Sequence, residues 1–128
     1  MTLRCLIIDD SQCFLHAARS LLEQQGMMIV GVASSTAEAL QHIEELRPDV
    51  ILLDIDLGGE SGLKLAKRLS CEHGQAWPAV ILISTHGEQD YAELIAASPA
   101  IGFLPKAALS AAAIEQLLAR CCGHNQAD

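Results

Sequence analysis

The chain has 128 residues, the length of one domain, and 51% of them are hydrophobic, so a sizeable core can form. A net charge of -8 argues against general attraction to nucleic-acid phosphates, and aromatic residues at 3% provide no stacking platform for single-stranded nucleic acid. No apolar stretch approaches the roughly 20 residues of a membrane span. Since no basic leader precedes the first apolar run, we expect a cytoplasmic protein.

Strand and helix patterns alternate along the chain. Continuous apolar runs indicate strands that are buried on both faces, and apolar residues at helical spacing indicate the helices between them. In chain order, the predicted elements are strand 3–8, helix 11–25, strand 27–33, helix 36–47, strand 50–53, helix 63–69, strand 79–83, helix 89–97, strand 101–104 and a last helix capped by Ser110.

Capping and turn residues mark several of these ends. Gly26 is expected to stop the first helix. Ser35 is expected to cap the second helix in a capping box, with the Glu38 side chain returning to the Ser35 amide. The stretch Leu-Gly-Gly-Glu-Ser-Gly at 57–62 has the composition of a turn and is predicted to be a loop.

The alternation predicts the fold class. Five strands and five helices at this spacing favour an α/β domain, a (βα)5 doubly wound parallel sheet with helices on both faces. We place this domain over residues 1–122 and expect the tail 123–128 to be frayed. In such sheets ligands bind beyond the carboxyl ends of the strands.

Polar residues follow the predicted strands at that edge of the sheet. The first strand is followed by Asp9 and Asp10, the third by Asp54, the fourth by Ser84 and the fifth by Lys106. Three adjacent carboxylates repel one another, so this cleft needs a bound cation or shifted pKa values. Magnesium prefers oxygen ligands, and lysine adds a compact positive charge. The set therefore suits phosphoryl transfer.

These five residues, in this order and at these strand ends, resemble the receiver domain of two-component response regulators. The resemblance covers roughly residues 3–121, and Gly-Phe-Leu-Pro-Lys at 102–106 is most similar to receivers of the NarL/FixJ type. It implies a flavodoxin-like receiver fold with strand order 2-1-3-4-5. It also implies phosphorylation-dependent signalling, in which the chain catalyses only its own phosphorylation and slow self-dephosphorylation and is otherwise not an enzyme.

The resemblance further implies a role for each site residue. Asp54 would accept a phosphoryl group from a sensor histidine kinase or phosphotransfer protein. The ligands of Mg²⁺, or of Mn²⁺, would be Asp9, Asp10, Asp54 and the backbone carbonyl of Asp56.

Ser84 and Lys106 would bind phosphoryl oxygens, and Phe103 would swing inward as Ser84 moves. Thr85 and His86 stand at the rim, where they would tune the reaction rate. The fourth helix, fifth strand and fifth helix would form the switching face and a possible homodimer contact. Output would control transcription through an effector domain absent from this chain, with no direct nucleic-acid or membrane binding.

The sequence departs from the receiver pattern at the rim. Many receivers have proline after the lysine, where this chain has Ala107, and proline four residues after the acceptor, where it has Gly58 followed by Gly59. The glycine pair predicts a mobile loop over the site.

Two other functions stay open. The segment Asp54-Ile55-Asp56 resembles the nucleophile motif of haloacid-dehalogenase-type phosphatases, although there the motif follows the first strand rather than the third. The second alternative is an interaction module that works without phosphorylation.

Overall fold

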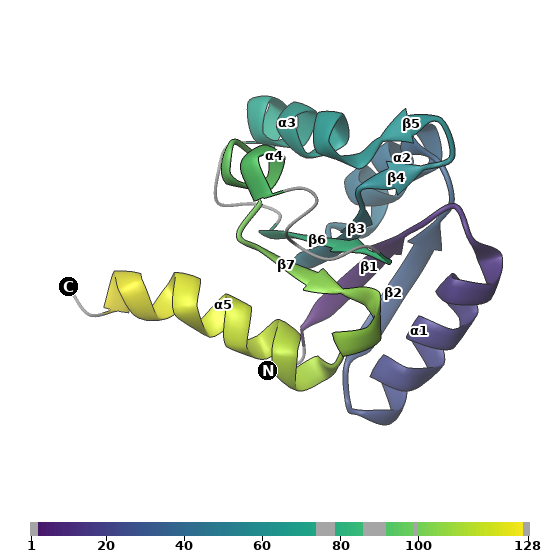
Figure 1. The fold of residues 1–128 in the computed structure, drawn as a ribbon. Coiled ribbons are helices and arrows are strands. Elements are labelled where there is room, and N and C mark those ends of the chain that lie inside the picture. The colour runs from purple at the N-terminus through teal and green to yellow at the C-terminus, as the bar shows by residue number, and fades with distance from the viewer. Residues whose placement is uncertain (1–2, 74–78, 86–91, 99, 127–128) are drawn as a thin grey trace.

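Five parallel strands form one sheet in the order β2-β1-β3-β6-β7 in the computed structural model, which describes residues 3–73, 79–85, 92–98 and 100–126 (Figure 1). This order is the predicted 2-1-3-4-5 arrangement, so both the fold class and the topology are confirmed. The strands are β1 (Arg4–Ile8), β2 (Met28–Ala33), β3 (Val50–Asp54), β6 (Ala79–Ser84) and β7 (Gly102–Pro105).

The helices connect successive strands as predicted. They are α1 (Gln12–Gln24), α2 (Thr36–Leu46), α3 (Gly62–His73), α4 (Ala92–Ala96) and α5 (Ala111–Gln126), with a 3-10 turn, η2 (Lys106–Ala108), before α5. The start predicted for the fourth helix, residues 89–91, lies outside the described residues. The last helix runs past the expected boundary at residue 122, because no proline interrupts it and one glycine, Gly123, costs a helix only about 1 kcal/mol.

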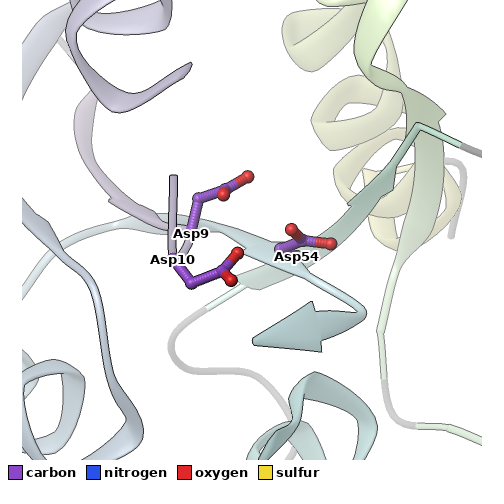
Figure 2. Close-up of side chains that lie close together, drawn as sticks. All are labelled: Asp9, Asp10 and Asp54. Atoms are coloured by element: carbon purple, nitrogen blue, oxygen red, sulfur yellow. The ribbon is translucent and has the colours of Figure 1, made fainter. Parts of the chain in front are cut away.

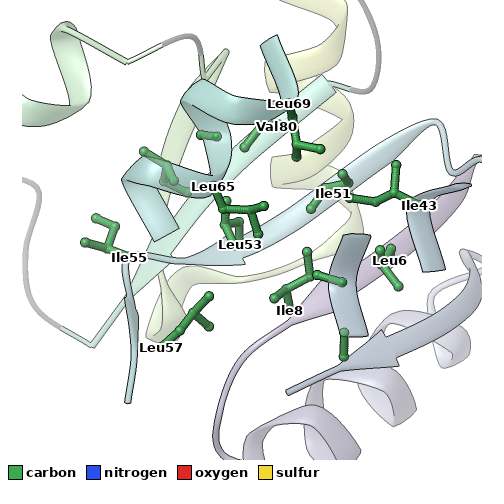
Figure 3. Packing of buried hydrophobic residues seen from close by; sticks show 14 of the residues in the cluster. Leu6, Ile8, Ile43, Ile51, Leu53, Ile55, Leu57, Leu65, Leu69 and Val80 are labelled. Carbon is green, nitrogen blue, oxygen red and sulfur yellow. The ribbon is translucent and has the colours of Figure 1, made fainter. Parts of the chain in front are cut away.

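Helices cover both faces of the sheet, with α1 and α5 on one side and α2, α3 and α4 on the other (Figure 1). On the second side, Ile51 and Leu53 of β3 pack against Leu65 and Leu69 of α3 (Figure 3). Every residue of β3 is buried, because the strand lies at the centre of a covered sheet. This explains why it appears in the sequence as an unbroken apolar run.

The capping box at α2 differs from the prediction by one residue. Ser35 is the N-cap, and its hydroxyl accepts the Glu38 N–H at 3.2 Å, as expected. The Glu38 carboxylate, however, accepts the N–H of Ser34 at 2.7 Å and the Ser34 hydroxyl at 3.2 Å, not the amide of Ser35. The backbone hydrogen bond from Ser34 lowers the pKa of Glu38.

Residues predicted as a loop after β3 form a small hairpin. Strand β4 (Asp56–Leu57) pairs antiparallel with β5 (Glu60–Ser61). The two residues between them, Gly58 and Gly59, have φ angles of 58° and 101°. A two-residue hairpin turn with positive φ at both positions favours glycine, so the Gly-Gly pair fits this turn closely.

The first and last helices are joined at their ends. The side-chain oxygen of Gln25, which follows α1, accepts the backbone N–H of Ala111 at 2.6 Å, at the start of α5. The Ser110 hydroxyl accepts the N–H of Ala113 at 3.0 Å, so Ser110 caps α5 as predicted. Within the described ranges, no helix is long and apolar enough to cross a membrane.

Candidate functional site

Three carboxylates meet at the carboxyl edge of the sheet (Figure 2). Asp9 and Asp10 follow β1, and Asp54 ends β3. Since Ile8 is in register with Leu53, the residues that follow them lie side by side. One oxygen from each carboxylate lies within 4.8 Å of the other two. The parallel topology thus brings together the acids that the sequence placed at this edge.

Asp9 is fully buried, with a hydrogen bond to one carboxylate oxygen and an ion pair to the other. Its Oδ1 accepts the backbone N–H of Ser11 at 2.8 Å, and its Oδ2 lies 2.5 Å from the Lys106 Nζ. A buried carboxylate without such partners would carry a large desolvation penalty. Ser11 is also the N-cap of α1, so the start of that helix holds Asp9 in place.

Asp54 is buried, with 6% of its surface exposed. The N–H of Asp56 donates to its Oδ1 at 3.1 Å, and Lys106 Nζ donates to its Oδ2 at 3.1 Å. Burial raises the pKa of the Asp54 carboxyl to about 6, and the charge of Asp9 adds to the rise, while the bonds from Asp56 and Lys106 oppose it. A carboxylate with a raised pKa in a cluster of titratable groups is a candidate functional group.

Lys106 lies directly after β7 and bridges Asp9 and Asp54. Burial acts to lower its pKa, but the hydrogen bonds and charges of the two carboxylates outweigh burial and raise it. Its Nζ also lies 4.3 Å from the centre of the Phe14 ring, a cation–π distance. The sequence did not single out Phe14, and no spacing in the chain links this residue of α1 to Lys106.

The other predicted residues lie around this centre. Ser84 ends β6 and is buried, and Thr85, which follows it, is exposed. Phe103 of β7 is buried in the core on the α2 and α3 side. The side chain of Asp56 is exposed, and its backbone N–H is the group that contacts Asp54. His86 lies outside the described residues.

The donor atoms fit a hard divalent cation. The cluster of Asp9, Asp10 and Asp54 offers only carboxylate oxygens, which Mg²⁺ prefers. Two of the three acids are buried, and the three carboxylates share the single positive charge of Lys106, so negative charge is in excess at the cluster. A second positive charge would therefore be stabilised here. Asp10 is the most exposed of the three and opens the cluster to solvent.

Comparison with known proteins assigns the chain to a family. The family model of the response regulator receiver domain matches residues 5–119. The chain is 28% identical over 104 residues to the DNA-binding transcriptional activator EvgA of Escherichia coli K12, covering 81% of this chain and 50% of EvgA. It is 35% identical over 88 residues to a protein-glutamate methylesterase/protein-glutamine glutaminase of Myxococcus xanthus, covering 68% of this chain and 25% of that protein. The chain thus spans a half or less of these curated relatives.

Solved structures give the same assignment. The signal receiver domain of the response regulator NarL from Mycobacterium tuberculosis has a TM-score of 0.72 at 31% identity, over 82% of this chain and 84% of that one. A CheY-like receiver protein from Methanospirillum hungatei shares the fold, with a TM-score of 0.78 at 19% identity over 100% of both chains. This chain therefore belongs to the response regulator receiver domain family of two-component systems.

Proposed function

We propose that this receiver accepts a phosphoryl group on Asp54 from a histidine kinase or phosphotransfer protein. The observation that carries the proposal is the pairing of Asp54, buried at the sheet edge, with Lys106 Nζ at 3.1 Å, beside two further carboxylates. Metal-assisted phosphoryl transfer needs this combination of a nucleophilic oxygen, a fixed positive charge and oxygen ligands for a cation.

In the reaction, an oxygen of Asp54 attacks the phosphorus of a phosphohistidine. The new O–P bond forms an acyl phosphate while the N–P bond breaks, and the electron pair stays with the imidazole nitrogen, which takes up a proton. The residues that would hold Mg²⁺ or Mn²⁺ are Asp9, Asp10 and Asp54, with the backbone carbonyl of Asp56. When bound, this ion supplies positive charge that offsets the phosphoryl oxygens.

The remaining residues bind and sense the new group. Lys106 donates a hydrogen bond to an Asp54 oxygen, which supports a role in pairing with a phosphoryl oxygen on that residue. Ser84 would donate its hydroxyl to another, and Phe103 would fill the space that Ser84 leaves. The exposed Thr85, with His86 beyond it, would set how readily water reaches the acyl phosphate.

Phosphorylation would switch the conformation of the face formed by α4, β7 and α5, and this face would pass the signal on. The same face would also serve as a homodimer contact. We place the receiver at residues 1–122, acting in the cytoplasm. The similarity to the transcriptional activator EvgA favours control of transcription through an effector domain outside these residues. The domain itself would bind neither nucleic acid nor membrane.

The phosphatase alternative loses its support, and the phosphorylation-independent module can be tested directly. The receiver match over residues 5–119 leaves nothing to favour a haloacid-dehalogenase-type phosphatase, and the Asp54-Ile55-Asp56 motif follows β3, not the first strand. A phosphorylation-independent interaction module has the same fold as a receiver, so only chemistry separates the two.

Acetyl phosphate with Mg²⁺ tests the proposal. The intact mass of the protein should increase by one phosphoryl group, and Asp54→Asn should abolish the increase. Asp56→Asn is the matched control, because the Asp56 side chain is exposed and its contact with Asp54 uses the backbone N–H. An unmodified wild-type chain, in the presence of Mg²⁺ and of a phosphorylated histidine kinase, would favour the phosphorylation-independent module.

A further inference from the structure

Gly58, in the turn of the β4–β5 hairpin, lies against the carboxylate of Asp10. A Cβ atom built on Gly58 would lie 2.7 Å from the Asp10 Oδ2 and 3.4 Å from its Cγ. The first distance is shorter than real Cβ contacts allow, so a side chain at this position requires one of the two groups to move. Gly59, the other residue of the turn, has nothing within 4 Å of its Cβ position.

The hairpin is fastened on both sides, so Asp10 is the group that would move. On one side, the Glu60 carboxylate accepts the backbone N–H of Thr36 at 3.0 Å, which ties the hairpin to the start of α2. On the other, the Gly62 N–H donates to the Ile55 carbonyl at 2.8 Å, which closes the base of the hairpin. The Asp10 side chain is exposed and can rotate, so its displacement costs less than moving the backbone.

We propose that Gly58 is a positioning residue for the divalent cation. In this turn, where residue 58 has a φ of 58°, its missing Cβ leaves the space in which the Asp10 carboxylate stands beside Asp9 and Asp54, and a side chain held at the same φ pushes that ligand away from the cluster. Receivers with proline at this position need a different turn, because proline fixes φ at about −65°. This inference rests on the proposed function, since it concerns the cation of the same site.

Titration calorimetry with Mg²⁺ on the metal-free protein tests the inference without a phosphorylation assay. Gly58→Ala should bind Mg²⁺ roughly 10-fold more weakly than wild type, the typical effect of disturbing a group that orients a metal ligand. Gly59→Ala is the matched control, because it places an alanine at a positive φ in the same turn but away from Asp10. Its Mg²⁺ affinity should stay within about twofold of wild type.

A second measurement separates the contact with Asp10 from turn strain. In urea unfolding without metal, Gly58→Ala should lower the midpoint more in the wild-type background than in an Asp10→Ala background, where the carboxylate is absent. If Gly58→Ala does not fold, the double variant should recover folding. Equal shifts in both backgrounds, or no recovery by the double variant, would overturn the inference.

The two failures can be told apart. If wild type binds Mg²⁺ and is phosphorylated, but Gly58→Ala and Gly59→Ala bind Mg²⁺ equally well, only the role of Gly58 is wrong. If wild type binds no Mg²⁺ and forms no adduct, the proposed function itself fails, and the role of Gly58 fails with it.

Discussion

The interior of the sheet and its carboxyl edge bury very different groups on the same strands. Within β1 and β3, Ile7 and Leu52 are fully buried apolar side chains that pack against α1 and α5. At the ends of these two strands, the chain buries the carboxylates of Asp9 and Asp54. Apolar burial stabilises the fold, whereas burying two like charges costs free energy that Lys106 offsets only in part.

This difference suggests how the domain divides its tasks. The interior provides the stability that allows an unfavourable arrangement of negative charge at the edge, and that arrangement favours a bound cation. Substitutions in the interior should therefore lower stability, and substitutions that remove negative charge at the edge should raise it.

The largest effect is expected in the interior. Leu52→Ala should lower the free energy of unfolding by about 2–5 kcal/mol, because it leaves a cavity beneath α1 and α5. Urea unfolding measures this loss. Leu21→Ala removes the same atoms from a side chain that is 39% exposed, and its effect should stay within about 0.5 kcal/mol. Similar losses for both variants would contradict a tightly packed interior.

At the carboxyl edge, a substitution should change the free energy of unfolding in the opposite direction. Asp54→Asn should raise the free energy of unfolding by about 1–3 kcal/mol at pH 7.5 without metal. The pKa of Asp54 rises from 3.8 to about 6 on folding, so the folded chain holds this proton more tightly than the unfolded chain does. Protonation of Asp54 therefore stabilises the fold. This stabilisation is fully present below pH 3.8 and is lost as pH rises through about 6. The gain from Asn, which imitates the neutral acid, should therefore shrink as pH falls from 7.5 towards 4. A gain independent of pH would argue against charge as its cause.

Cation binding should relieve the same repulsion. At tenfold its dissociation constant, Mg²⁺ should add about 1.4 kcal/mol to the stability of wild type, because only the folded chain assembles the site. Thermal unfolding with and without a chelator measures this shift. The shift should nearly vanish in Asp10→Asn, which loses a ligand, and persist in Asp56→Asn. Equal shifts in the two variants would place the cation elsewhere.

The smallest effect concerns the aromatic ring against Lys106. The coupling between Phe14→Leu and Lys106→Met, from a double-mutant cycle in urea, should be about 0.5–1 kcal/mol for a cation–π contact. Fluorinated phenylalanines at position 14 keep the shape and weaken the ring quadrupole, so stability should fall stepwise with fluorination. A flat response would reduce the contact to ordinary packing.

Much of the fold and of the cluster could be predicted because both depend on the strands. Continuous apolar runs marked the strands, and parallel pairing then placed Asp9, Asp54 and Lys106 at one edge. The hairpin was missed because β4 and β5 have two residues each, too few for periodicity to detect. The contacts of Phe14 with Lys106 and of Gly58 with Asp10 depend on side-chain packing between separate elements. Sequence spacing alone does not specify such contacts.

The hydrogen bond from the Ala111 N–H to the Gln25 side chain has a consequence for the order of folding. It joins residues 86 positions apart, so it can form only after a long loop has closed. During synthesis, α1 is made early, and the Gln25 side chain that follows it has no Ala111 N–H to accept until α5 has been made. We expect this contact to form late, after β1, β2 and α1 have assembled, and Gln25→Ala to speed unfolding while leaving the folding rate almost unchanged.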